Sequence, residues 1–169
     1  MENATNKVGA LIKTTELGTD MFRGLHEHNL DAKGRVSMPV RFRELLSPEK
    51  DASSKFVLTT GLEKCLVLYP EKVWTEFESK LAALSQFDPA VVQIRRIYMA
   101  GATECTLDKH GRVLIPPMLR EFAKLEKEAV WAGMGKTIEV WSKASWTHQV
   151  EQARHDPAAV AAALASLGI

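Results

Sequence analysis

The chain of 169 residues is 46% hydrophobic and 25% charged, which is ordinary composition for a globular protein with a core of its own. This length predicts one domain, or two small domains that are tightly joined. The formal net charge of +1 is too small to attract an anionic polymer by itself. Any such binding must therefore come from a local cluster of cations. No apolar run approaches the roughly 18–20 residues of a membrane-spanning helix.

Residues 1–20 contain only short apolar pieces and lack the small-residue cleavage site that follows the apolar core of a secretory signal. We expect them to be a disordered N-terminal extension, an upstream start or an added remnant. Met21 is then the expected functional beginning of the chain.

The first expected elements are a hairpin and a short helix. A strand within 22–30 ends at Asp-Ala-Lys-Gly, where Asp31 and Gly34 suit the first and fourth positions of a tight turn. The second strand of this hairpin is expected over 35–38. Pro39 suits the first position of a helix. Behind it, three apolar residues recur at the spacing of one helical face: Phe42, Leu45 and Leu46.

The next expected elements are a second hairpin and a group of helices. Strands are expected over 56–60 and 66–69, with a turn at Gly-Leu-Glu-Lys between them. Apolar residues then follow helical spacing, and Asp88-Pro89 is typical of the start of a further helix that runs through Met99. The apolar residues of the first of these helices are Trp74, Phe77, Leu81 and Leu84.

The chain repeats itself. Residues 29–46 (NLDAKGRVSMPVRFRELL) align with 106–123 (TLDKHGRVLIPPMLREFA) at an offset of 77, and eight of the aligned pairs are identical. Residues 59–75 align with 131–147 at an offset of 72. This offset is smaller than the first one because the first copy has a longer loop, over 47–55. A duplicated module is therefore the best single account of the sequence.

The repeat divides the chain into five expected segments. The extension over 1–20 is followed by a first unit over 21–70 and a helical connection over 71–104. A second unit over 105–145 has Leu119 and Phe122 on its buried helical face, and a helical segment fills 146–169. Asp156-Pro157 is expected to start a last alanine-rich helix with a thin apolar face, either mobile or packed on a neighbouring subunit.

The repeated Asp-x-x-Gly-Arg motif has two interpretations. In the first, the Asp accepts hydrogen bonds within its own turn and pairs with the Arg, which contributes roughly 0–1 kcal/mol at a surface. In the second, the motif is part of a cationic ridge that meets phosphates, and its arginines can also bond the edge of guanine. We expect the first role for Asp31, Gly34, Asp108 and Gly111, which would shape the turns.

The cations of the first copy favour the second interpretation. Residues 21–46 contain five Lys and Arg residues against three Asp and Glu residues. The second copy is less cationic, because Met118 stands at the position that corresponds to Arg41, and His110 at the position that corresponds to Lys33. The residues expected to contact an anionic polymer are Lys33, Arg35, Arg41, Arg43, Lys109 and Arg112.

Enzymatic function is not favoured. Histidines, acids and cysteines supply catalytic residue types, but the sequence has no glycine-rich phosphate loop, nucleophile elbow or metal signature. His26 and His28 share one face of a strand, which a metal could use, although solvated histidines are the favoured interpretation. Cys65 and Cys105 form no Cys-x-x-Cys pair and are expected to be reduced, partly buried thiols of a cytosolic protein, with a disulfide less favoured.

The doubled motif resembles the MraZ family of bacterial proteins. Leu30-Asp31-x-Lys33-Gly34-Arg35 with Pro39 and Arg43, followed by Leu107-Asp108-x-x-Gly111-Arg112 with Pro116 and Arg120, carries this resemblance over 21 to about 152. It implies an α+β fold in which two pseudo-symmetric AbrB-like (swapped-hairpin) units form one compact, β-barrel-like core with flanking helices.

The resemblance also implies a function. Proteins of this family are expected to assemble into rings and to regulate transcription by binding repeated double-stranded DNA boxes upstream of their own division and cell-wall gene cluster. It points to Lys33, Arg35 and Arg112 as DNA-facing residues and to a cytoplasmic, nucleoid-associated protein without a cofactor, metal, membrane or small-molecule ligand. The alternative is an AbrB-like antitoxin or protein-interaction module that binds no specific promoter.

Overall fold

The computed structural model of the protein describes residues 21–47 and 54–169. The expectations for 1–20 lie outside the described residues. No helix among those described is long and apolar enough to cross a membrane.

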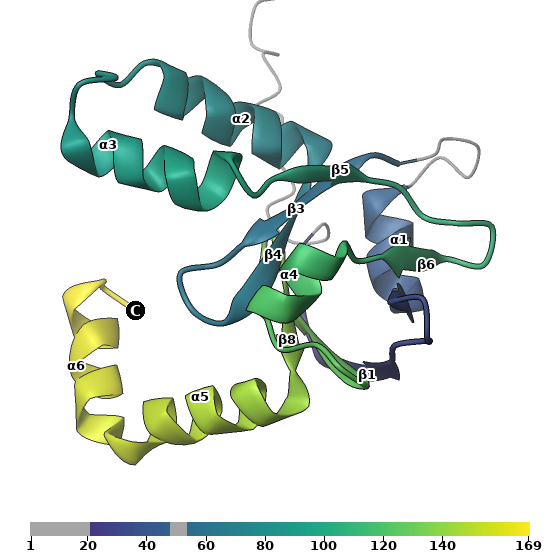
Figure 1. The fold of residues 1–169 in the computed structure, drawn as a ribbon. Coiled ribbons are helices and arrows are strands. Elements are labelled where there is room, and N and C mark those ends of the chain that lie inside the picture. The colour runs from purple at the N-terminus through teal and green to yellow at the C-terminus, as the bar shows by residue number, and fades with distance from the viewer. Residues whose placement is uncertain (1–20, 48–53) are drawn as a thin grey trace, which may run out of the picture.

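Six strands form one sheet in which every neighbouring pair is antiparallel (Figure 1). Its order is β1 (Leu25–Asn29), β7 (Glu128–Gly133), β8 (Ile138–Ser142), β4 (Cys65–Pro70), β3 (Phe56–Thr60) and β5 (Thr103–Cys105). Together with the helices this confirms an α+β fold. The sheet of the described residues is open, with β1 and β5 at its edges, so the expected barrel-like closure is not confirmed.

The two copies exchange their first strands. β1 of the first copy pairs with β7 of the second over five register positions, and β5 of the second copy pairs with β3 of the first. The two second hairpins, β3–β4 and β7–β8, form as predicted and join through β4 and β8. The strand order is therefore symmetric about the β4–β8 pair, which is the arrangement expected of two swapped units.

The hairpin predicted at the start of each copy is wrong, because β1 and β2 (Arg35–Ser37) do not pair as a hairpin and neither do β5 and β6 (Arg112–Leu114). Within the first copy, the strand before the turn and β2 share only an isolated bridge between Leu30 and Val36. β2 instead pairs antiparallel with β6 of the second copy, as a separate two-stranded ribbon. The tight turn was predicted correctly, but the partner of each strand lies in the other half of the chain, where local turn signals give no information.

The main core lies between the sheet and the ribbon. Two short helices, α1 (Val40–Leu46) and α4 (Pro117–Phe122), follow the ribbon strands, and Pro39 is the N-cap of α1 rather than its first residue. Phe42 and Leu119 are buried at equivalent positions of these helices. They join one apolar cluster with side chains of the sheet that include Phe56, Leu58, Leu66, Leu68, Trp131, Ile138 and Val140.

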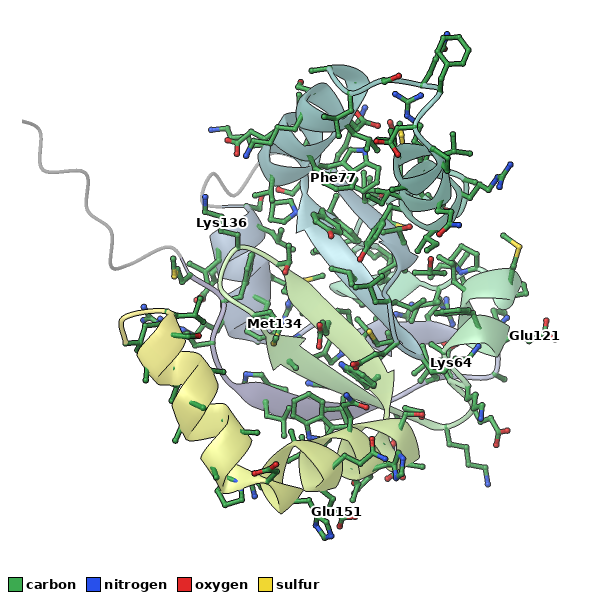
Figure 2. The ribbon with its side chains drawn as sticks, turned by 90° about the vertical axis from the view of Figure 1, so that its left-hand side faces the viewer. Lys64, Phe77, Glu121, Met134, Lys136 and Glu151 are labelled. Carbon is green, nitrogen blue, oxygen red and sulfur yellow. The ribbon has the colours of Figure 1, made fainter. Side chains whose placement is uncertain are left out.

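Helices cover the opposite side of the sheet. α2 (Glu71–Ala82) and the π-helical turn η1 (Arg95–Met99), which continues α3 (Pro89–Ile94), lie against β3 and β4. Figure 2 shows Phe77 directed from α2 toward the helix formed by α3 and η1. The centroid of its ring lies 5.6 Å from that of Tyr98 in η1. Asp88 caps α3 as predicted, because its side chain accepts a hydrogen bond from Ala90 N at 2.8 Å.

The C-terminal helices lie away from the ribbon (Figure 1). α5 (Lys143–His155) packs on β7 and β8, with Trp146 against Trp141. α6 (Pro157–Ser166) begins at the predicted Asp156-Pro157 restart, and all of its residues are exposed.

Candidate nucleic-acid interface

The two Asp-x-x-Gly-Arg turns have the same geometry. In the first, Asp31 Oδ1 accepts hydrogen bonds from Lys33 N and Arg35 N, both at 2.9 Å. Asp31 Oδ2 accepts a hydrogen bond from Arg35 Nε at 2.6 Å. Asp31 N donates to Arg35 O and Gly34 N donates to Asp31 O, each at 2.9 Å. The turn is therefore fixed by its own carboxylate, and Arg35 is held at its end.

The second turn repeats each of these contacts. Asp108 Oδ1 accepts from His110 N and Arg112 N at 2.8 and 2.9 Å, and Asp108 Oδ2 accepts from Arg112 Nε at 2.8 Å. These bonds give the aspartates the turn-shaping geometry expected of them. Since each aspartate takes only the Nε of its arginine, the Nη groups are left to bond another acceptor.

Both aspartates are held in the charged form. The backbone amide of Arg112 is the main cause that lowers the pKa of Asp108 to about 2, with further contributions from the His110 amide and the Arg112 side chain. The Arg35 amide is likewise the main cause that lowers the pKa of Asp31. The turns therefore keep their carboxylates ionised throughout the neutral pH range.

The ribbon places both arginines on one outward face. Val36 and Val113 are directly opposite each other and fully buried, so their side chains point inward. Side chains alternate along a strand and directly paired residues share a face, so the flanking residues point outward. The outward face consists of two register pairs, Arg35 opposite Leu114 and Ser37 opposite Arg112.

The two arginine side chains converge on this face. Arg112 Nη1 lies 3.8 Å from Asp31 Oδ2, the same oxygen that accepts the hydrogen bond of Arg35. Both arginine side chains are partly accessible, with exposed fractions of 32% for Arg35 and 27% for Arg112. Lys33 and Lys109 are exposed at the two turns. The structure thus brings together four of the six cations that the sequence predicted as contacts.

The two cations of α1 differ from each other. Arg41 is exposed, whereas Arg43 is partly buried and its guanidinium lies over Gly111 in the turn of the second copy. The Nε atom of Arg43 is buried and has no hydrogen-bond partner among the described residues. The structure therefore packs Arg43 against the second turn, where it contacts protein.

The histidines of β1 share one face, as predicted, but are not simply solvated. The His26 ring meets Phe42 edge-on at 5.2 Å, and His28 is partly buried. In the part of the chain that the structure describes, no group of three or more His, Cys, Asp or Glu side chains could hold a metal ion.

The cysteines are buried and unpaired with each other. Burial raises the pKa of Cys65 to about 12 and that of Cys105 to about 11. Because the thiolate is the reactive form, both side chains behave as inert core residues.

Sequence reasoning missed two residues of this region. Leu114 is 58% exposed in the centre of the outward face, and its alternation with the buried Val113 and Ile115 is the signal that could have placed it there. Arg120 lies over Gly34 of the first turn, as Arg43 lies over Gly111. The sequence match of Arg120 with Arg43 was visible, but it carried no information about which turn each one contacts.

Comparison with known proteins identifies the family. Residues 21–97 and 98–166 each match the family described as "MraZ protein, putative antitoxin-like". A protein named transcriptional regulator MraZ from Desulfitobacterium hafniense (strain DSM 10664 / DCB-2) is 43% identical over 149 residues, which cover 88% of this chain and all of that protein. The protein of the same name from Carboxydothermus hydrogenoformans is 45% identical over 128 residues, covering 76% of this chain and 85% of that protein. The chain belongs to the MraZ family.

Proposed function

We propose that this protein is a transcriptional regulator that binds double-stranded DNA through the outward face of the β2–β6 ribbon. The observation that carries the proposal is the pairing of β2 with β6, because it sets Arg35 and Arg112 on one accessible surface. The relatives named transcriptional regulator MraZ support this assignment.

The shape and chemistry of the ribbon suit the major groove of DNA. That groove admits a two-stranded β-ribbon, and arginine forms bidentate hydrogen bonds with the O6 and N7 atoms of guanine. Each arginine is already oriented by its own aspartate, so less side-chain entropy is lost on binding. Ser37 and Leu114 complete the outward face and could contact base edges or a thymine methyl group.

The exposed cations beside the ribbon suit phosphate contacts. Lys33 and Lys109 lie at the two turns, and Arg41 is exposed on α1. Such contacts orient a protein on the duplex and make its affinity depend on salt, but they do not read sequence. Because the chain carries a net charge of only +1, these local cations would supply the electrostatic attraction.

We further propose that several subunits associate, as a ring, and engage repeated DNA boxes upstream of the protein's own division and cell-wall gene cluster. The exposed apolar side chains of α6 and the following residues, Val160, Leu164, Leu167 and Ile169, support self-association. The working location of such a regulator is the cytoplasm, on the nucleoid, and its role requires no catalysis. We also propose two units close to the limits predicted from the sequence, 21–70 and 105–145, with the second unit beginning at β5, that is, at Thr103.

Titration of a fluorescent duplex from the DNA upstream of the gene tests the proposal. We expect wild-type protein to bind this duplex more tightly than a scrambled duplex of equal length, and Arg35→Ala and Arg112→Ala to weaken specific binding. Arg154→Ala, which removes an exposed cation from α5, is the matched control and is expected to bind like wild type. Equal affinity for both duplexes would overturn specific DNA binding and favour a protein-interaction module.

A further inference from the structure

We infer that Arg120 and Arg43 are positioning residues, each of which holds the DNA-contacting turn of the opposite copy. The inference rests on the proposed function, because it assigns these two side chains to the orientation of Arg35 and Arg112. It replaces direct DNA contact, the role that the sequence predicted for Arg43.

Arg120 of α4 covers the turn of the first copy. Its Cζ, Nε and Nη1 atoms lie 2.5, 2.6 and 2.7 Å from the position that a Cβ on Gly34 would occupy. The backbone reinforces this contact, because Ile115 N donates a hydrogen bond to Gly34 O at 3.0 Å. Arg120 Nε is itself held by Ile115 O at 3.1 Å. The guanidinium is thus fixed between its own strand and the turn of the other copy.

Arg43 of α1 covers the turn of the second copy in the same way. Its Nη1, Cζ and Cδ atoms surround the position of a Cβ on Gly111. Met38 N donates a hydrogen bond to Gly111 O at 3.0 Å, which repeats the backbone contact of the first turn. Arg43 Nε, unlike that of Arg120, is buried without a hydrogen-bond partner among the described residues, so packing on the turn fixes this side chain.

The contact with the glycine requires the shape of an arginine side chain, and it is made from only one of the two arginine positions of α1. A planar guanidinium can lie flat on a glycine, whereas a compact ammonium cannot cover the same surface. Arg41 is on the same short helix and has the same charge, but it is exposed, so charge alone does not explain the position of Arg43. Both glycines are buried beneath their arginines, and each neighbouring turn carries one arginine of the outward face.

The consequence is a crossed dependence. Arg120 belongs to the second copy but supports the turn of Arg35, and Arg43 belongs to the first copy but supports the turn of Arg112. A change at Arg120 should therefore act on DNA binding through Arg35, with little effect through Arg112. A role in the general stability of the fold would affect both turns alike.

Amide hydrogen exchange of the complete protein without DNA tests the positioning directly. In Arg43→Met, we expect the amides of Gly111 and Arg112 to exchange roughly tenfold faster, while those of Gly34 and Arg35 keep their rates. Arg120→Met should show the reverse pattern, and Arg41→Met should change neither turn. Equal acceleration of both turns in either variant, or of neither, would overturn the inference whether or not the protein binds DNA.

Double-variant cycles on the promoter duplex test the consequence for binding. The double variant Arg43→Met/Arg112→Ala should lose no more affinity than the more damaging single variant, whereas the fold-losses of Arg43→Met and Arg35→Ala should multiply. Arg120→Met should instead be non-additive with Arg35→Ala, and the effect of Arg41→Met should multiply with that of either alanine variant. If the fold-losses multiply in every pair, crossed positioning is contradicted, even if DNA binding itself is confirmed.

A second pair of variants keeps the test decisive if a methionine variant fails to fold. Arg43→Lys and Arg120→Lys retain the charge and most of the apolar stem. The same exchange pattern and the same pairwise couplings are expected, with smaller fold-changes. Wild-type exchange rates and full additivity in both lysine variants would show that charge suffices and would overturn the inference.

Discussion

Gly34 and Gly111 occupy a backbone conformation that few other residues adopt, with φ angles of +81° and +72°. A residue with a Cβ in this region costs roughly 1–2 kcal/mol, and here the added carbon would also collide with a guanidinium of the opposite copy. The glycines therefore serve two purposes: they permit the turn, and they leave room for the arginine that lies over it. A turn signal in the sequence explains only the first purpose.

We accordingly expect Gly34→Ala to lower the free energy of unfolding by at least about 1–2 kcal/mol. Chemical denaturation followed by circular dichroism measures this change. Gly101→Ala is the control, because the nearest atoms to its Cβ lie 3.7–3.8 Å away and its φ is not positive. A loss for Gly34→Ala no larger than that of the control would show that the turn relaxes without cost.

At the scale of elements, local sequence signals predicted turns and helix starts reliably, but they did not predict which distant strands pair. The second hairpins and the helix starts at Pro89 and Pro157 follow from turn residues, caps and apolar spacing, and the structure confirms them. The pairs β1–β7 and β2–β6 join residues that are far apart in the sequence, so no local signal specifies them. The local alternation indicates only that Leu114 points outward; which residues share its face depends on the β2–β6 pair, which explains why the candidate face was predicted only in part.

The partial burial of His28 on β1 makes stability depend on pH. Burial is the largest cause that lowers the pKa of His28 below its usual value of 6.5, and the charges of His26 and Arg43 lower it further. Because the unfolded chain then binds more protons than the folded chain, this contribution to stability is complete above about pH 6.5 and is lost as the pH falls toward the folded-state pKa.

We therefore expect the thermal unfolding temperature to decrease as the pH is lowered from about 7.5 to about 5.5, and the decrease to be smaller in His28→Gln. Differential scanning calorimetry at several pH values gives the comparison. His148→Gln, which changes an exposed histidine of α5, should keep the pH dependence of wild type. The same decrease in His28→Gln as in wild type would exclude His28 as its source.

At the scale of the whole molecule, one ribbon offers a small contact surface on a nearly neutral chain. Two arginines and a few neighbouring cations would bind a single DNA box weakly and with a strong dependence on salt. If subunits associate, several ribbons can engage successive boxes, and each further contact becomes an intramolecular event at high effective concentration. The spacing of the boxes then becomes part of what is recognised, because only some spacings allow simultaneous contact.

This view predicts that Arg35→Ala weakens binding to a duplex with several boxes by a much larger factor than binding to a duplex with one box. Each engaged subunit loses the same contact, so the individual losses multiply on the longer duplex. Fluorescence titrations with both duplexes at two salt concentrations measure this, and the affinity for the longer duplex should also fall more steeply with salt. Light scattering on the same samples verifies that the variant keeps the association state of wild type. Equal losses on the two duplexes would mean that the boxes are bound independently, and that association of subunits does not contribute to recognition.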